Sequence, residues 1–152
     1  MPKLPFADFE LPATSNTIFK LSEQRGHPVV IYFYPKDNTP GCTTEGEQFR
    51  DAYMKFLKAG AIVVGCSRDS LKSHENFKAK MNFPFELIAD ADEKLCAQFD
   101  VIKMKNMYGK KVRGIVRSTF LIDGAGRLAR EWRGVKVDGH VDEVLAAVEA
   151  LA

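Results

Sequence analysis

The chain has 152 residues, of which 45% are hydrophobic and 28% are charged, as in an ordinary soluble domain with a real core. Its 22 basic and 20 acidic residues give a net charge of +2, which favours neither a nucleic acid nor a membrane as partner. No apolar run could span a bilayer, and residues 1–10 lack the order of a signal peptide. Three cysteines are too few for a disulfide scaffold. We therefore expect one domain, residues 1–152, in a reducing compartment, the cytoplasm.

The first half of the chain passes from strands to a helix. Residues 17–20 alternate polar and apolar like an edge strand, and residues 29–34 form a continuous apolar run, typical of a strand buried on both faces. From Thr43 the period becomes that of a helix, which Gly60 ends. The inward face of this helix is predicted to carry Phe49, Ala52, Tyr53, Phe56 and Leu57.

The second half continues the alternation. The pattern predicts a strand at 61–65, a helix at 71–80, a strand at 85–89, a helix from Asp92 to Phe99, a hairpin of strands 118–122 and 128–132, and a last helix capped by Asp138 with Val141, Val144, Leu145 and Val148 inward. Residues 103–111 are basic and without a period, which predicts a solvated loop, with a binding role as the alternative. This order indicates an α/β fold with a central mixed sheet flanked by helices.

One thiol stands where a strand is followed by a helix. After the apolar run at 29–34 the sequence reads Pro35-Lys36-Asp37-Asn38-Thr39-Pro40-Gly41-Cys42. A cysteine at a helix start meets the positive end of the helix and unpaired backbone N–H groups. Both favour the thiolate, which is the reactive form. Cys42 is therefore the candidate nucleophile, with a role in core packing as the alternative.

The spacing Pro35-x-x-x-Thr39-x-x-Cys42 resembles the active-site motif of the peroxiredoxins. Residues 117–123, which begin with Arg117, resemble the segment that brings the family's arginine to the thiol. The similarity covers residues 4–151 and is greatest to the bacterioferritin comigratory protein branch, also called PrxQ. It implies a thioredoxin-like fold and a thiol-dependent peroxidase in antioxidant defence and cell redox homeostasis. The expected substrates are hydrogen peroxide and small organic hydroperoxides, with no cofactor and no metal.

The residues of the motif suit peroxide chemistry. A thiolate attacks one peroxide oxygen while negative charge grows on the departing one, so a permanent cation such as Arg117 helps both. The Thr39 hydroxyl, the Cys42 amide and Arg117 are the expected donors to the peroxide oxygens. Pro35 is expected to shield the thiolate from water, and Gly41 to allow close approach of backbone and peroxide. The alternatives are a surface ion pair for Arg117 and a turn role for Thr39.

Other polar residues have ordinary explanations. The sequence predicts His27, His74 and His140 as strand-edge, surface and helix-start residues, and Glu45 as a capping group in the first helical turn. The cysteines and histidines show no metal-ligand spacing.

Attack on peroxide leaves Cys42 as a sulfenic acid, which needs a second thiol. Relatives carry a resolving cysteine five residues after the first or on the next helix. Here those places hold Glu47 and the cysteine-free segment 71–80. Cys66 and Cys96 remain, and core packing is the expected role of each.

We therefore expect a one-cysteine peroxidase regenerated by thioredoxin, by glutaredoxin with glutathione, or by a small thiol. The alternatives are two-cysteine turnover through Cys66 or Cys96, and a redox sensor or holdase acting through oxidised Cys42. A thiol–disulfide oxidoreductase is disfavoured, because Glu45 stands where Cys-x-x-Cys needs its second cysteine. The branch is often monomeric, so we expect a monomer, with a dimer as the alternative.

Overall fold

The computed structural model describes residues 7–151. In this part of the chain seven strands form one mixed sheet: β1 (Glu10–Ala13), β2 (Thr17–Lys20), β3 (Val29–Phe33), β4 (Ile62–Ser67), β5 (Glu86–Ala89), β8 (Ser118–Ile122) and β9 (Leu128–Arg133). Their order is β2-β1-β5-β4-β3-β8-β9, with β3, β4 and β5 parallel and the other pairs antiparallel. The predicted α/β fold with a central mixed sheet is confirmed.

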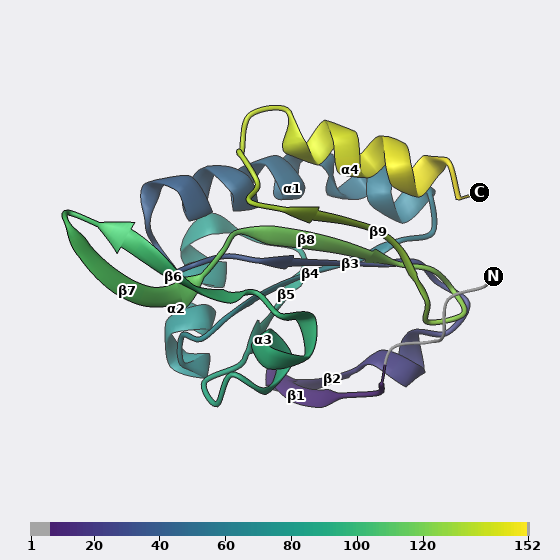
Figure 1. Cartoon of the computed structure of the whole chain (residues 1–152). Helices are drawn as coiled ribbons and strands as arrows, with labels where there is room; N and C mark the ends of the chain where they lie inside the picture. The colour runs from purple at the N-terminus through teal and green to yellow at the C-terminus, as the bar shows by residue number, and fades with distance from the viewer. Residues whose placement is uncertain (1–6, 152) are drawn as a thin grey trace.

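Four helices and one 3-10 turn cover the sheet (Figure 1). They are η1 (Leu21–Gln24), α1 (Pro40–Lys58), α2 (Leu71–Met81), α3 (Lys94–Phe99) and α4 (His140–Glu149) in the described residues. α1 and α4 lie side by side above the sheet, and α3 lies on the opposite side. No helix among residues 7–151 has both the length and the apolar character that crossing a bilayer requires.

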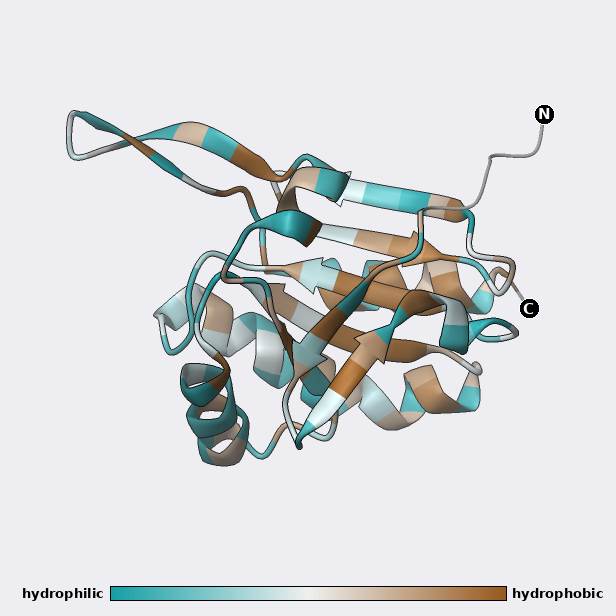
Figure 2. Ribbon diagram, turned by 90° about the horizontal axis from the view of Figure 1, so that it is seen from below, coloured by the Kyte–Doolittle hydropathy of each residue, from teal (hydrophilic) through white to brown (hydrophobic). Residues whose placement is uncertain are grey.

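The sheet separates two hydrophobic clusters. All five residues of β3 are buried, and they alternate between the faces as a strand period of two requires. Val30 and Tyr32 belong to the cluster beneath α1, α2 and α4, which we call the α1 core. Ile31 and Phe33 belong to the cluster with α3 and β1, which we call the α3 core. Figure 2 shows the resulting concentration of hydrophobic residues along the central strands.

α1 is held to the sheet by aromatic packing. Tyr32 stacks on Phe49 with ring centroids 4.6 Å apart, and Phe49 and Phe56 are fully buried. At Gly46 an added Cβ would lie 2.4 Å from the ring of Phe83, so a glycine is needed for this close approach. The predicted inward position of Leu57 is wrong, because 44% of this residue is exposed at the last turn of the helix.

Two predicted helix starts are also wrong. α3 begins at Lys94 rather than at Asp92, and the carboxylate of Asp90 accepts the backbone N–H groups of Leu95 and Cys96 at 3.1 and 2.8 Å. α4 is preceded by Gly139 at φ +74°, a left-handed conformation that favours glycine over the predicted cap, Asp138. The four inward residues predicted for α4 are all buried.

The basic segment 103–111 is a ribbon and not the predicted loop. β6 (Ile102–Met107) and β7 (Lys110–Ile115) pair antiparallel and project from the body of the protein (Figures 1 and 2). Tyr108 and Gly109 join them with φ values of +53° and +78°, the positive values that a tight hairpin turn of two residues requires. Solvent reaches both faces of this ribbon, so its strands need no alternation of hydrophobic and polar residues. The sequence pattern therefore did not predict them.

Candidate active site

Cys42 lies at the carboxyl end of β3, in the first turn of α1. The helix begins after Thr39, whose carbonyl accepts the N–H of Thr43 at 2.8 Å. The Thr39 hydroxyl does not cap the helix, because it donates to the carbonyl of Lys36 at 2.8 Å. The amides of Gly41 and Cys42 therefore remain at a helix start without a side-chain cap, where the helix dipole is positive. Cys42 is only 2% exposed, so solvent screens this field weakly.

Arg117 brings a cation to the thiol. This residue directly precedes β8, and its Nη2 lies 3.4 Å from the Sγ of Cys42. A Cβ on Gly41 would lie 3.1 Å from the same nitrogen, so the glycine makes room for the guanidinium. The sequence predicted Cys42, Arg117 and Gly41 as one group, and the structure brings the three together.

Glu45 holds the other side of the guanidinium. Nη1 of Arg117 donates to Oε1 of Glu45 at 2.6 Å, and Glu45 is fully buried. Burial raises the pKa of Glu45 to about 7, although the charge of Arg117 opposes the change. Burial alone would lower the pKa of Arg117, but the charges on Glu45 and Cys42 outweigh it and hold that pKa above its usual value. Arg117 therefore stays cationic beside the thiol.

The predicted capping role of Glu45 is wrong. Glu45 lies three residues after Cys42 and four before Phe49, a spacing that places all three on the inward face of α1. This helical spacing indicates that Glu45 faces inward, whereas the active-site motif, which ends at Cys42, does not include Glu45.

Two buried side-chain oxygens, one on Glu45 and one on Tyr32, are unpaired in residues 7–151. They are Oε2 of Glu45 and the hydroxyl oxygen of Tyr32. Burial, and then the charge on Glu45, raise the pKa of Tyr32 well above its usual value, so the phenol keeps its proton. An unpaired carboxylate oxygen in the core favours the protonated carboxyl, in agreement with the raised pKa of Glu45.

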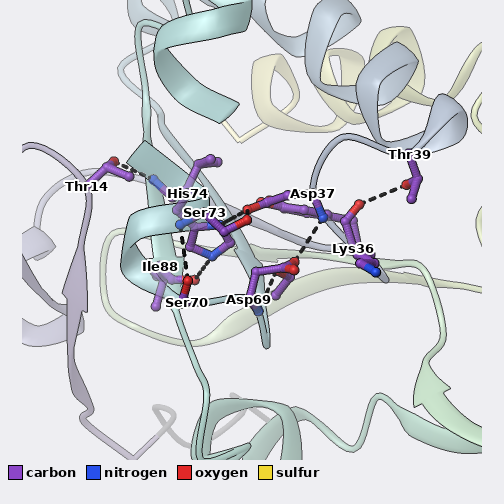
Figure 3. Close-up of polar contacts among 12 residues, drawn as sticks. Thr14, Lys36, Asp37, Thr39, Asp69, Ser70, Ser73, His74 and Ile88 are labelled. Atoms are coloured by element: carbon purple, nitrogen blue, oxygen red, sulfur yellow. Dashed lines mark hydrogen bonds and ion pairs between the residues drawn. The ribbon is translucent and has the colours of Figure 1, made fainter. Parts of the chain in front are cut away.

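A second polar group fixes the loop before Thr39 (Figure 3). Asp37 accepts hydrogen bonds from the hydroxyl of Tyr34 at 2.6 Å and from that of Ser73 at 2.8 Å, and its Oδ2 lies 2.7 Å from Nδ1 of His74. Nε2 of His74 lies 2.9 Å from the carbonyl of Ile88. A carbonyl only accepts, so Nε2 of His74 is the donor in this contact. We call this group the Asp37–His74 clasp; it ties the loop to α2.

The prediction of His74 as a surface residue is therefore wrong, since the side chain is fully buried. His74 precedes the buried Phe77 by three residues on α2, and this spacing could have placed it inward. Ligand-type atoms of Asp37, Asp69 and His74 lie within 4.8 Å of one another. Asp69 accepts the backbone N–H of Asp37 at 2.9 Å. The oxygens of Asp37 and Asp69 and Nδ1 of His74 are therefore already engaged in hydrogen bonds with neighbouring protein groups.

Pro35 and two histidines, His27 and His140, are the other residues considered in the sequence. Pro35 is half-buried at the end of β3. His27 is exposed before β3, and His140 starts α4, as predicted. Burial lowers the pKa of His140 to about 4, so this imidazole is neutral, and it lies 2.8 Å from the hydroxyl of Thr119.

Cys66 and Cys96 lie across the sheet from Cys42. Both are fully buried in the α3 core, whereas Cys42 belongs to the α1 core. Burial raises the pKa of the Cys66 thiol well above its usual value, and Cys96 and the charge of Asp90 raise it further. The expected packing role of these cysteines agrees with their positions.

A thioredoxin-like sheet that presents a buried thiol at a helix start to an arginine defines a thiol-dependent peroxidase. Comparison with known proteins agrees with this class. Residues 2–130 match the AhpC/TSA family. The chain is 57% identical to peroxiredoxin Bcp of Xanthomonas campestris pv. campestris, over 99% of this chain and 95% of the relative. It is 48% identical to peroxiredoxin Bcp of Bacillus subtilis, over 95% and 92%.

Solved structures give the same result. The bacterioferritin comigratory protein of Xanthomonas campestris matches with a TM-score of 0.90 at 55% identity, covering 94% of this chain and 91% of that one. A mutant of Xylella fastidiosa PrxQ matches with a TM-score of 0.93 at 44% identity, covering 99% and 96%. The chain therefore belongs to the AhpC/TSA family, in its Bcp/PrxQ branch, and is a peroxiredoxin. A peroxide substrate and a thiol reductant follow from this membership.

Proposed function

We propose that Cys42 is the peroxidatic nucleophile of this peroxiredoxin and that an external thiol regenerates it. The observation that carries the proposal is the 3.4 Å contact between Arg117 and the buried sulfur of Cys42 at the start of α1. A cation and a helix start both stabilise a thiolate. Since a lowered proton affinity also weakens a nucleophile, fast reaction needs groups that act on the peroxide itself.

In the proposed step the thiolate attacks one peroxide oxygen. An S–O bond forms, the O–O bond breaks, and the departing oxygen takes a proton to leave as water or an alcohol. Cys42 is oxidised to a sulfenic acid while the peroxide is reduced. In this proposal Arg117 and the Cys42 amide donate to the oxygen that gains charge. The sequence predicted the Thr39 hydroxyl as a donor to the peroxide, but its one proton is donated to the carbonyl of Lys36. In this proposal Thr39 therefore accepts the O–H of a hydroperoxide instead.

Pro35 has the more modest role of limiting water at the thiol. It is half-buried after the end of β3. Because proline has no backbone N–H, it offers no donor that would bind a water molecule at this position. The Asp37–His74 clasp fixes the loop between Pro35 and Thr39, which holds Thr39 in place relative to Cys42.

Regeneration by an external thiol is supported by the positions of the cysteines. A disulfide needs Cα atoms within about 7 Å, and Cys66 and Cys96 lie in the α3 core on the other face of the sheet. α2 contains no cysteine. The proposed reductant is thioredoxin, or glutaredoxin with glutathione.

The substrate class extends to organic hydroperoxides. The similar bacterioferritin comigratory protein of Xanthomonas campestris has alkyl peroxide reduction activity, and we propose small alkyl hydroperoxides beside hydrogen peroxide here. The three free cysteines support a reducing compartment, the cytoplasm, and we propose a monomer as the working form.

The test is mass spectrometry of protein treated with one equivalent of peroxide and no reductant. The expected product is a sulfenic acid at Cys42 with Cys66 and Cys96 as thiols. An internal disulfide from Cys42 would overturn the one-cysteine mechanism. Steady-state turnover with thioredoxin against glutaredoxin, on wild type and on Cys66→Ser and Cys96→Ser, then identifies the reductant.

A further inference from the structure

The ribbon of β6 and β7, residues 102–115, is a basic extension of a nearly neutral protein. Residues 102–115 contain five lysines and arginines and no aspartate or glutamate, whereas the whole chain has a net charge of only +2. The ribbon projects beyond the end of the sheet in both views (Figures 1 and 2). Positive charge is therefore concentrated on one extension, which we call the basic ribbon.

The basic ribbon exposes apolar side chains as well as charge. Tyr108 at the turn is 99% exposed, Met104 is 62% exposed and Val112 is 42% exposed. The ribbon is anchored at its base, where Ile115 is buried and Ile102 packs on the α3 core. A two-stranded ribbon alone is marginally stable in water. Aromatic residues and methionine beside basic residues are typical of a protein–protein interface.

The two faces of the basic ribbon differ in how their charges are used. Cross-strand partners share a face, so Lys105 and Val112 lie on one face, with Lys110 two residues from Val112. On the other face Arg113 donates to Glu93 at 2.6 Å. Neither Lys105 nor Lys110 forms an ion pair with a carboxylate in residues 7–151. We call the face with Lys105 and Lys110 the lysine-bearing face. It has two lysines without a carboxylate partner among the described residues, whereas the other face has one, Lys111.

That face lies toward the active site. Nζ of Lys105 donates to the carbonyl of Ile115, which is two residues before Arg117. Burial and then the charge of Arg117 lower the pKa of Lys105, while the charge on Cys42 raises it. Lys105 is therefore within electrostatic reach of both catalytic groups. A partner held on this face would lie beside the thiol.

We propose that the lysine-bearing face of the basic ribbon docks an acidic protein that carries the reducing dithiol. The inference rests on the proposed regeneration of Cys42 by an external thiol, and adds where that thiol donor binds and what charge it carries. Complementary charge raises the rate of encounter, and exposed Val112 and Tyr108 supply apolar contact once the partner is bound.

Reduction of oxidised Cys42 by the docked partner takes two steps. A thiolate of the partner attacks the sulfur of the Cys42 sulfenic acid, an S–S bond forms, and the S–O bond breaks to release hydroxide, which takes the proton of the partner's second thiol and leaves as water. The second thiolate formed in this way attacks the partner's first sulfur in the mixed disulfide. Cys42 leaves as a thiolate, and the partner is oxidised by two electrons to a disulfide.

The experiment compares two reductants on oxidised protein: a thioredoxin of net negative charge, and dithiothreitol, which is small and uncharged. The ribbon variant is Lys110→Glu with Lys111→Glu. The matched control, Lys55→Glu with Lys58→Glu, makes the same charge change on the exposed end of α1 away from Cys42. The rate constant for reduction of oxidised Cys42 is measured for each protein at low and at high ionic strength.

We expect the ribbon variant to lose about tenfold or more of its rate with thioredoxin at low salt. Its rate with dithiothreitol should stay within about twofold of wild type, and the control variant should behave as wild type with both. The difference between wild type and ribbon variant should shrink as salt rises. Lys110→Glu alone should have the larger effect of the two single substitutions, because Lys110 is on the docking face.

Three results would overturn the proposal: an unchanged thioredoxin rate in the ribbon variant, an equal loss in the control, or no reduction of the wild type by thioredoxin while dithiothreitol still works. Oxidation of Cys42 by peroxide without reductant is measured in parallel. Failure of that step would refute the peroxidase function itself, so the two failures are distinguishable.

Discussion

The two faces of the central sheet both bury thiols, but they surround them with opposite charge. On the α1 face Cys42 stands at a helix start, 3.4 Å from the guanidinium of Arg117. On the α3 face burial raises the pKa of Cys66 well above its usual value, the neighbouring Cys96 raises it further, and the negative charge of Asp90 acts in the same direction. Both sulfurs are almost completely buried. Since both sulfurs are buried, we expect the sign of the neighbouring charge to distinguish the proposed nucleophile, Cys42, from the packing thiol, Cys66.

Removing the reactive sulfur should have the largest effect. Cys42→Ser is expected to abolish peroxide reduction and to leave the fold intact, because serine is close in size and its hydroxyl is not ionised at neutral pH. Peroxide consumption with dithiothreitol as reductant measures the activity, and circular dichroism checks the fold. Activity retained in a folded Cys42→Ser protein would show that the chemistry lies elsewhere.

Removing the cation should make the two faces more alike. Arg117→Ala is expected to slow oxidation of Cys42 by about 10²–10³-fold, the usual effect of losing one donor to a developing oxyanion. Arg117→Lys keeps the charge without the forked geometry and should be intermediate. Stopped-flow oxidation of Cys42 without reductant measures both variants. Full activity of Arg117→Ala would remove Arg117 from the mechanism.

Glu45 offers a test of the same face by pH. Its pKa is about 7 in the folded protein against 4.5 ordinarily, so between these pH values the folded state binds more protons than the unfolded state. Stability should therefore fall as pH rises through that window, by about 3 kcal/mol. Glu45→Gln removes this proton and should flatten the fall.

The matched control for this test is Glu47→Gln, on the same helix and partly exposed. It should keep the wild-type slope. Urea unfolding at several pH values between 4.5 and 8 measures the slope. Equal slopes in wild type and in Glu45→Gln would contradict the buried, proton-holding state of Glu45.

The smallest effect is expected on the α3 face. Cys66→Ala and Cys96→Ala should leave the peroxide step within about twofold of wild type and destabilise the fold by about 1 kcal/mol, as for an average core truncation. The same stopped-flow and urea measurements apply. A large loss of turnover in either variant, with the peroxide step unchanged, would instead give that cysteine a role in regeneration.

The sequence predicted the elements whose hydrophobic period is strong. β3 and the inward face of α4 follow directly from apolar patterns, because burial on two faces or on one stripe leaves an unmistakable trace. The starts of α3 and α4 and the basic ribbon did not, since they depend on Asp90, on Gly139 and on a tight turn at Tyr108. Caps and turns are chosen by local geometry that several residue types satisfy.

The candidate site shows the same division. Cys42 and Arg117 were predicted from a motif with fixed spacing, and the structure places them in contact. Glu45 and His74 were misassigned because polar residues are usually exposed, whereas here each is buried by a partner distant in sequence, Arg117 and Asp37. Only tertiary structure supplies such partners. Spacing to Phe49 and Phe77 was the one sign that these polar residues face inward.

Titration of the Cys42 thiol measures whether Arg117 and the start of α1 ionise this sulfur at neutral pH. Its ultraviolet absorbance is followed against pH in protein that carries Cys66→Ala and Cys96→Ala, with and without Arg117→Ala. The predicted result is a sulfur that is mostly ionised at neutral pH when Arg117 is present and mostly protonated when it is absent. A sulfur that remains mostly protonated near pH 8 beside an intact Arg117 would contradict the electrostatic origin of its reactivity.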